Sequence, residues 1–431
     1  MPSSSLMSLL HPQTVEPKII PRPEHSISRA QIDLEALKVL YRLHHQGYQA
    51  YLVGGSVRDL LLGKKPKDFD VVTDAHPRIL RRLFRNSRII GRRFRLVQVF
   101  FRGGKVVEVS TFRQQSEFDS EEVLAPNNTF GTPAEDARRR DLTINGLFYN
   151  IADFSVVDYV GGLEDLRQGR IRVIGCPELR LRRDPVRMVR VLRHAARTGF
   201  VIDAQVWAEI QAQRHLIRIC APARVRDELL KDLRGGWAQK YLELMINSGL
   251  LGAIFPAWEP ALASQISKLQ ARQEWLKLFH QVDKLTAAEY PLSEAFFWAV
   301  LFTPHLELFP ATVDAGNYRA WVQERITDSL ISLEFPRGRR EEICLLLATD
   351  MALTQSLEQG RPISAKLKRR VCFAEAWLLH RIKTAAASAT VEELLPAPTK
   401  PPLQTKRPPR KRRRRRSSRP TSPKKPAAAE T

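Results

Sequence analysis

Hydrophobic and polar residues in the first half of the chain follow both helical and strand periodicities. Apolar positions at helical spacing predict a helix over residues 28–45, and the short apolar run 51–53 predicts a strand. A longer apolar run covers residues 89–100, and apolar and polar residues alternate over 106–112. Because Gly103-Gly104 lies between these two runs, we expect a β-hairpin there. This half therefore predicts a small sheet combined with helices.

The pattern changes in the second half, where long segments rich in Leu and Ala contain few Gly or Pro. A long helix is expected to begin near Leu181 and to end at Gly199. From about Val201 to Lys383 the sequence predicts further helices without a fixed repeat period, which favours an irregular helical body over a solenoid. Four of these helices are expected at residues 224–233, 238–247, 294–302 and 340–353.

The stretch that follows the first predicted strand has the features of a phosphate-binding turn. The strand stops at Gly54-Gly55, where glycine permits a close backbone approach, and Ser56 is expected to cap a helix that runs to Leu62. Such a turn presents free N–H groups and the positive end of a helix, which suits a phosphate. Arg58, in the first turn of this helix, is expected to add a charged donor.

Two closely spaced aspartates, Asp68 and Asp70, come next. In a strand, residues two positions apart face the same way, so both carboxylates point at one spot while Phe69 points into the core. Two carboxylates beside a phosphate site are what a Mg²⁺ ion needs to bridge the protein and a triphosphate. Alternation over 106–112 makes Glu108 a candidate for a third carboxylate beside this pair.

Each feature alone also has an ordinary structural interpretation. A glycine pair before a helix is commonly only a tight turn, an Asp-x-Asp pair is commonly a solvated strand end, and Glu108 fits an exposed sheet face equally well. The features support one another because they occur in order. Gly-Gly-x-Val-Arg-Asp, Leu-Gly and Asp-x-Asp together resemble the signature of the polymerase-β-like nucleotidyltransferases, in the branch of the tRNA CCA-adding enzymes and bacterial poly(A) polymerases.

A second segment resembles another motif of this family, Arg-Arg-Asp-x-Thr-x-Asn. The resemblance implies that Arg140, Asp141 and Asn145 belong to the nucleotide site and the catalytic centre. The spacing does not decide whether Asp141 or Glu108 completes the acidic set, and we prefer Asp141.

The neck motif of the family, Glu-Asp-x-x-Arg, is retained only in part. Asp184 and Arg187 occupy matching positions, whereas Arg183 stands where Glu is usual. The resemblance implies that Asp184 and Arg187, with Arg190 nearby, bind the nucleotide; an Asp offers acceptors and an Arg offers donors to a base edge. The change at Arg183 leaves the strictness of ATP selection open.

The run from Ile89 to Val99 bears on the choice between the two enzyme classes. Gly-Arg-Arg-Phe-Arg-Leu between aliphatic residues resembles a strand signature of the bacterial poly(A) polymerases, although Gln98 departs from the His that is common there. This resemblance favours poly(A) polymerase over a CCA-adding enzyme.

The charge of the chain favours a polyanionic partner. The formal net charge is +23, and thirteen Lys and Arg from Lys400 onward, against Glu430, place about +12 of it at the end of the chain. Because this segment has no aromatic residue to stack on bases, it is expected to bind phosphates without reading sequence. The residues expected to bind RNA are Arg410, Lys411, Arg412, Arg413, Arg414, Arg415 and Arg416.

Cysteine usage and hydropathy bound the cellular context. Four widely separated Cys without a Cys-x-x-Cys pair argue against a disulfide framework or a Cys-based zinc site and suit a reducing cytosol. There is no signal peptide and no apolar run near 18 residues, so we expect a cytoplasmic protein without membrane contact.

The expected fold class is α+β, with a polymerase-β-like nucleotidyltransferase head containing a small mixed sheet, an irregular all-α neck and body, and a disordered basic tail. The predicted segments are a disordered start at 1–27, the catalytic head at 28–175, the neck at 176–235, the body at 236–392 and the tail at 393–431.

The expected function is template-independent, Mg²⁺-dependent addition of AMP from ATP to RNA 3′ ends with release of pyrophosphate. RNA 3′ ends and ATP are the expected partners of a monomer, and protein partners of RNA turnover fit the same role. The alternatives are a tRNA CCA-adding nucleotidyltransferase and a non-catalytic RNA-binding protein.

Overall fold

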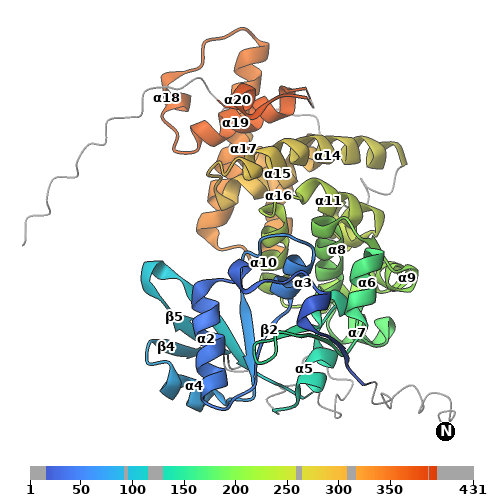
Figure 1. Cartoon of the computed structure of the whole chain (residues 1–431). Coiled ribbons are helices and arrows are strands. Elements are labelled where there is room, and N and C mark those ends of the chain that lie inside the picture. Colours follow the sequence, from blue (N-terminus) through green and yellow to red (C-terminus); the bar gives the residue numbers. More distant parts are fainter. Residues whose placement is uncertain are drawn as a thin grey trace, which may run out of the picture. The chain divides into compact units, whose positions relative to one another are not determined.

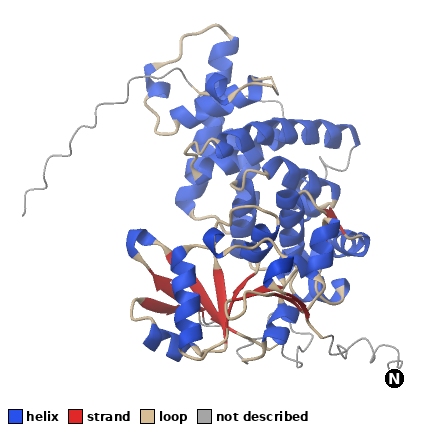
Figure 2. Ribbon diagram, in the orientation of Figure 1, coloured by secondary structure: helices blue, strands red, loops and turns tan. Residues whose placement is uncertain are grey.

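Eight strands of the computed structural model form one sheet in the first half of the chain (Figures 1 and 2). The structure describes residues 16–91, 96–114, 130–258, 265–307, 317–386 and 388–395. The strands are β1 (Lys18–Ile20), β2 (Ala50–Val53), β3 (Asp70–Thr73), β4 (Ser87–Ile90), β5 (Leu96–Phe100), β6 (Val106–Thr111), β7 (Leu147–Asn150) and β8 (Val156–Asp158). Their order across the sheet is β1-β8-β7-β2-β3-β6-β5-β4; β3 and β6 are parallel, and all other neighbours are antiparallel.

Helices cover one face of the sheet and build the main core of the head. Helix α2 (Leu34–His45) packs against β2 and β3, and α4 (Pro77–Leu83) packs against β4 and β5 (Figure 1). The same core includes apolar residues of α3 (Gly55–Leu61) and α6 (Gly162–Gln168). The alternation that the sequence showed thus buries Val107 and Val109 under these helices.

The opposite face of the sheet is covered only over part of its width. A smaller core there joins Val53, Val72 and Phe148 of the strands to Ala137 of α5 (Pro133–Arg139). Asp70 and Glu108 lie on this second face and are exposed. The hairpin expected across Gly103-Gly104 is confirmed, since β5 and β6 pair antiparallel.

Three expectations for the head need correction. The helix expected from residue 28 begins only at Leu34, and Arg29–Gln31 before it forms a separate 3-10 turn. Residues 1–27 were expected to lack stable structure, but Lys18–Ile20 forms β1, which pairs with β8 at one edge of the sheet. The apolar run 89–100 was expected to act as one strand; instead its first residues belong to β4 and its last to β5, an antiparallel pair. Residues 92–95 of the strand signature lie outside the described residues.

The neck consists of short helices that follow the sheet. They are α7 (Pro177–Arg183), α8 (Val186–Thr198), α9 (Ala204–Gln213) and α10 (Pro222–Leu233), with a two-strand pair of β9 (Arg170–Ile171) and β10 (Val201–Ile202) beside them. One continuous helix was expected from Leu181 to Gly199. The structure divides it at Asp184-Pro185, because proline cannot donate the backbone hydrogen bond that a continuous helix needs.

The body is helical, as the sequence predicted. Its helices are α11 (Ala238–Asn247), α12 (Leu250–Ile254), α14 (Gln265–Ala287), α15 (Glu294–Glu307), α16 (Tyr318–Ser332), α17 (Arg337–Glu358), α18 (Ala365–Lys368), α19 (Phe373–Thr384) and α20 (Val391–Leu394). The four helices predicted in this half lie within α10, α11, α15 and α17. Among the described helices, none has the length and apolar character needed to cross a membrane.

The predicted fold class is confirmed for the mixed-sheet head and the helical part. The predicted boundary at 175/176 falls just before α7, and the one at 235/236 falls between α10 and α11. The division into head, neck and body stays a prediction. Residues 396–431 lie outside the described residues, so the RNA-binding role predicted for Arg410–Arg416 stays a prediction as well.

Candidate active site

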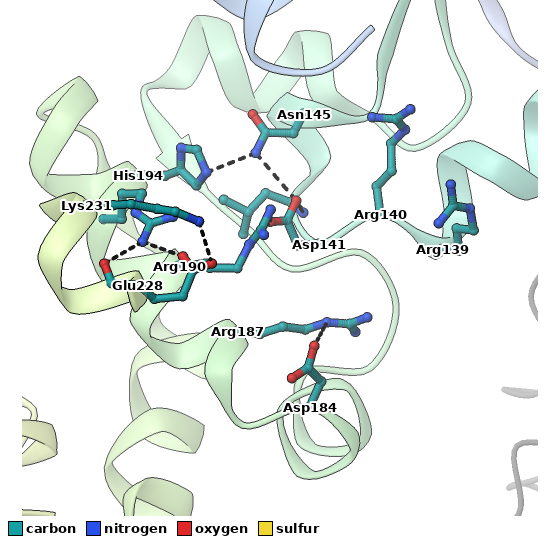
Figure 3. A network of polar contacts seen from close by, with 12 residues as sticks. Arg139, Arg140, Asp141, Asn145, Asp184, Arg187, Arg190, His194, Glu228 and Lys231 are labelled. Carbon is teal, nitrogen blue, oxygen red and sulfur yellow. Dashed lines mark hydrogen bonds and ion pairs between the residues drawn. The ribbon is translucent and has the colours of Figure 1, made fainter. Parts of the chain in front are cut away.

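A cavity of about 450 Å³ brings the predicted head and neck residues together. The head contributes Asp70, Glu108, Arg140 and Asp141, and the neck contributes Asp184, Arg187 and Arg190. Three arginines that the sequence analysis did not select, Arg113, Arg139 and Arg224, line it as well. Figure 3 shows the residues of the neck and those around Asp141 in one view. The same cavity is therefore lined by both carboxylates and arginines.

Asp70 and Glu108 are paired in register on the neighbouring strands β3 and β6. Residues paired in this way point to the same face of a sheet, so the position expected for Glu108 is confirmed. Glu108 accepts a hydrogen bond from Gln98 Nε2 at 2.9 Å. Phe69 packs against the main core, as expected, between the exposed residues Asp68 and Asp70. The two aspartates were expected in one strand, but β3 begins only at Asp70, so Asp68 lies before it.

The surroundings of Asp70 favour a bound cation. Loss of solvation among the cavity walls raises the pKa of Asp70 to about 6, although its side chain keeps contact with water. Arg140 opposes this shift, whereas the negative charges of Glu108 and Asp68 add to it. A carboxylate held next to two others is a group whose charge a metal ion would stabilise.

The glycine turn is built as the sequence predicted, except at Ser56. Gly54 caps α3 with φ +75°, a conformation that L side chains rarely adopt. A Cβ atom on Gly54 would lie 3.4 Å from Arg140 Nη1, so the turn and this guanidinium are adjacent. Ser56 was expected to cap the helix, but its buried hydroxyl donates to the Val53 carbonyl at 2.9 Å.

Arg139 and Arg140 are held by one buried carboxylate. Asp136 is fully buried in α5; its Oδ1 accepts from Arg139, and its Oδ2 accepts from Arg140 Nη2 at 3.0 Å. These guanidiniums hold the pKa of Asp136 below its usual range, against the effect of burial. Asp136 thus fixes two cations at the cavity wall. The sequence offered only the Arg138-Arg139-Arg140 run as a signal.

Arg58 does not take the role expected for it. It was predicted to donate to a phosphate, but its side chain is fully buried and bonded within the protein. Its guanidinium donates to Asp59 Oδ1 at 2.7 and 2.9 Å and to Asn145 Oδ1 at 2.6 Å. Asp59 also accepts a hydrogen bond from Arg197 of α8 at 2.6 Å. Arg58 and Asp59 together therefore connect α3 to the neck helix α8.

Asn145 is likewise buried and points into this junction. Its Nδ2 lies 3.2 Å from His194 Nε2 and 3.4 Å from Asp141 Oδ1 (Figure 3). Arg58 Nη1 lies 3.2 Å from the other ring nitrogen, Nδ1 of His194. Burial and the charge of Arg58 lower the pKa of His194 well below its usual value. No local sequence motif marks His194 as a residue of this junction.

Asp141 is occupied on both of its oxygens. Arg190 of α8 donates to Oδ2 at 2.7 and 2.8 Å, and the Leu142 N–H donates to Oδ1 at 2.8 Å. Burial works to raise the pKa of Asp141, yet Arg190 and His194 hold it far below the usual range. Asp141 therefore connects the head to the neck helix α8 through its ion pair with Arg190.

Asp184 and Arg187 lie together at the break between α7 and α8, as Figure 3 shows. Arg224 of α10 donates to both oxygens of Asp184, at 2.8 and 3.0 Å. Arg187 is 3.7 Å from Asp184, and burial lowers the pKa of its guanidinium. Arg224 follows Asp184 by 40 residues, so sequence spacing gave no sign of this pairing.

The carboxylates fit a magnesium ion only together with substrate oxygens. No group of three or more His, Cys, Asp or Glu in the described ranges could by itself hold a metal ion. Magnesium is commonly bound by one or two carboxylates together with phosphate oxygens and water. Asp70 and Glu108, with Asp68 beside them, supply hard oxygen ligands of this kind.

Family models match two parts of the chain. The model described as "Poly A polymerase head domain" matches residues 50–172. The model described as "Probable RNA and SrmB- binding site of polymerase A" matches residues 199–262. The first range contains Asp70, Glu108 and Asp141.

Proteins similar to this chain include poly(A) polymerases and CCA-adding enzymes. Poly(A) polymerase I of Escherichia coli O157:H7 is 49% identical over 248 residues, which cover 55% of this chain and 53% of that protein. Poly(A) polymerase I of Haemophilus influenzae is 36% identical over 312 residues, covering 70% and 69%. The CCA-adding enzyme of Bacillus pumilus is 35% identical over 217 residues, covering 50% and 53%. The chain spans about half the length of the Escherichia and Bacillus relatives.

The solved structures resemble this fold over most of its length. The structure titled "Thermotoga maritima CCA-adding enzyme complexed with tRNA_CCA" has a TM-score of 0.61 at 22% identity. It covers 85% of this chain, which in turn covers 82% of it. At this identity the likeness concerns the fold alone.

Proposed function

The chain belongs to the family of the bacterial poly(A) polymerases and tRNA nucleotidyltransferases, and on this premise we propose that it adds AMP from ATP to RNA 3′ ends without a template. The reaction is Mg²⁺-dependent nucleotidyl transfer. The RNA 3′-hydroxyl attacks the α-phosphate of ATP, and pyrophosphate leaves.

One observation carries this proposal: a single cavity joins the in-register carboxylates Asp70 and Glu108 to arginines from two parts of the chain. Arg139 and Arg140 supply positive charge on the head side, and Arg187 and Arg190 supply it on the neck side. Phosphoryl transfer needs mainly positioning and charge stabilisation, which this arrangement provides without a His or Cys nucleophile.

We assign the acidic set to Asp68, Asp70 and Glu108. This revises the preference for Asp141, because Asp141 has Arg190 and the Leu142 N–H on its oxygens. A bound Mg²⁺ would neutralise charge on the triphosphate and favour ionisation of the 3′-hydroxyl. Asp70 and Glu108, with Asp68 beside them, would hold the ion, and Asp141 keeps Arg190 at the cavity wall.

The base is read on the neck side of the cavity. Arg187 provides donors, and Asp184 provides acceptors whose direction is set by the two bonds from Arg224. Gly54-Gly55 and Arg140 lie beside one another and together form the triphosphate end of the site.

Addition of AMP alone is favoured over addition of C, C and A. The poly(A) polymerase I of Escherichia coli is more similar to this chain than the Bacillus CCA-adding enzyme, at 49% against 35% identity. The strand signature of residues 89–99 points the same way. CCA addition is the second candidate, since the Bacillus relative and the fold neighbour are CCA-adding enzymes.

Extension of labelled RNA tests the proposal. An oligo(A) primer and a tRNA lacking its CCA end are each incubated with Mg²⁺ and one nucleotide at a time. Long tails from ATP and little incorporation from CTP on both primers are expected. Addition of C, C and A to the tRNA, followed by arrest, would establish the second candidate. Binding of RNA without any addition would support a non-catalytic RNA-binding protein.

A further inference from the structure

We propose that the open face of the sheet between Glu108 and Arg88 holds the 3′-terminal nucleotides of the RNA primer. This rests on the proposed nucleotidyl transfer, but it concerns where the RNA lies and not which nucleotide is added.

One residue from each of four neighbouring strands forms a polar row across the sheet. Arg88 of β4 pairs with Gln98 of β5, Gln98 pairs with Glu108 of β6, and Glu108 pairs with Asp70 of β3. Residues in register share a face, and the 2.9 Å hydrogen bond from Gln98 to Glu108 agrees with this. Because strands lie about 4.8 Å apart, the row extends about 14 Å from Asp70 to Arg88.

Among the described helices, none covers the face that carries this row at β4 and β5. Helix α4 packs on the opposite face of these strands, and no other described helix is in extensive contact with them. Ile90 and Leu96 form the next row on the open face, and Ile90 is 36% exposed at the edge strand. The face thus offers apolar surface for bases beside polar groups for a sugar and a phosphate.

The position of Arg140 indicates the side from which the RNA approaches the row. Arg140 lies beside Gly54, at the end of β2, and β2 neighbours β3 on the side away from β6. The triphosphate charge is stabilised at that end of the row. In an in-line displacement, the attacking oxygen enters opposite the leaving pyrophosphate. The 3′-hydroxyl therefore enters from the side of Glu108, and the preceding nucleotide lies over Gln98 and Arg88.

Gln98 and Arg88 have the chemistry for this role. Arg88 is exposed, so its guanidinium is available to a backbone phosphate. Gln98 uses its amide N–H on Glu108, and no described residue donates to its amide oxygen. That oxygen can accept from a ribose 2′-hydroxyl, the group by which proteins distinguish RNA from DNA.

Photocrosslinking locates the RNA directly. An oligo(A) primer carrying 4-thiouridine as its penultimate nucleotide is irradiated with the full-length protein, and crosslinked peptides are identified by mass spectrometry. Crosslinks to residues 87–100 are expected. Crosslinks confined to residues 199–262 or to the helical body would overturn the proposal.

Variants test the two contacts separately. For Arg88→Ala we expect the KM for the primer to rise about five- to tenfold and the salt slope of RNA binding to fall by about 0.7, with the KM for ATP unchanged. Arg82→Ala removes an exposed arginine from α4, on the covered face, and should change neither value. An unchanged primer KM in Arg88→Ala would contradict the phosphate contact.

Gln98→Leu is compared with the parent on two primers, one ending in ribose and one in 2′-deoxyribose. We expect the parent to favour the ribose end by about fivefold, and the variant to lose this preference. The ratio cancels any general loss of rate that a displaced Glu108 causes. A variant that keeps the parental ratio would contradict the 2′-hydroxyl contact.

The tests of the RNA position do not depend on which nucleotide the protein adds. If the protein adds C, C and A instead, the same variants and the same crosslink are measured with the tRNA primer. If no nucleotide is added at all, the proposed function fails, and the crosslinked peptide still shows whether RNA occupies the open face.

Discussion

The proposed metal binding requires an ionised Asp70, whereas burial and the neighbouring carboxylates favour its protonation. Its pKa of about 6 lies within the range in which RNA extension can be assayed. The main cause is loss of solvation, and Glu108 and Asp68 add to it. Metal binding and proton binding therefore compete at this residue.

The concentration of Mg²⁺ needed for half-maximal extension should depend on pH. Below about pH 6 the ionised fraction of Asp70 falls, so this concentration should rise by up to about tenfold per pH unit, and it should level off above pH 7. Magnesium titrations between pH 5 and 7.5 measure it. Glu108→Gln removes a charge that raises the Asp70 pKa, so the midpoint in this less active variant should move to lower pH. A half-saturating concentration that is constant down to pH 5.5 would contradict the assignment.

Arg58 and Arg187 should differ in what their removal costs. Arg58→Ala leaves Asp59 buried without its nearest cation, and we expect a loss of about 3–5 kcal/mol in the free energy of unfolding. Arg187→Ala should raise the KM for ATP at least tenfold with a much smaller loss of stability, because its ion pair with Asp184 is long, at 3.7 Å. Denaturant unfolding measures the loss of stability in both variants, and steady-state kinetics measures the change in the KM for ATP. Equal loss of stability in the two would refute the distinction.

At the scale of elements, α8 is the link between the two walls of the cavity. It carries Arg187 and Arg190 toward the cavity and His194 toward α3. Both neighbours of the His194 ring nitrogens, Arg58 and Asn145, are donors there, while a neutral imidazole has one acceptor nitrogen and an imidazolium has none. The junction therefore excludes protonation of this ring.

This exclusion predicts a loss of stability in acid. His194 has a folded-state pKa well below 6.5, so as pH falls below 6.5 the unfolded chain takes up a proton that the folded chain does not. The free energy of unfolding should fall by up to about 1.4 kcal/mol per pH unit from this residue. Denaturant unfolding from pH 7.5 to 5.5 is compared for the parent and His194→Gln, in which this part of the slope should vanish. Identical slopes would show that the imidazole is protonated in the fold.

Helix α10 should influence nucleotide choice although it contributes no predicted motif residue. Its Arg224 fixes Asp184 through two hydrogen bonds, so Arg224→Ala frees the acceptors that we propose read the base. We expect the ratio of kcat/KM for ATP over CTP to fall about tenfold, because the loss of one hydrogen bond to a charged group is worth about 1.5–3 kcal/mol. Arg224→Lys keeps the charge but not the two-pronged guanidinium, so its ratio should lie between those of the parent and Arg224→Ala. An unchanged ratio in Arg224→Ala would remove Asp184 from base recognition.

At the scale of the whole molecule, the RNA-binding role of the basic tail stays a prediction from sequence. Removing residues 396–431 should weaken RNA binding and flatten its salt dependence, while single-turnover addition at saturating RNA changes little. If about six tail cations contact phosphates, the single-strand slope of about −0.7 per contact gives a tail contribution near −4. This corresponds to about two to three decades of affinity between about 50 and 200 mM salt. Unchanged affinity and slope in the truncated protein would favour a protein partner for the tail.

Local patterns predicted the parts of this molecule that depend on neighbouring residues. The hairpin, the glycine turn and the face shared by Asp70 and Glu108 follow from alternation and turn chemistry. Partners far apart in sequence were not predictable: Arg58 with His194 is one such pair, and Asp184 with Arg224 is another. Motif spacing put Arg58 at a phosphate because it marks a helix turn but not the direction of the side chain.

The parallel pairing of β3 with β6 also sets the order in which the site can assemble. Asp70 and Glu108 meet only after the chain has passed through α4, β4 and β5 and returned, so their contact closes a loop of 38 residues. The neck wall comes later still, with Arg224 as the last residue to join the cavity. During synthesis, a chain ending before β6 carries one aspartate pair and no nucleotide site. The proposed nucleotide addition therefore requires that the chain has been synthesised at least as far as Arg224.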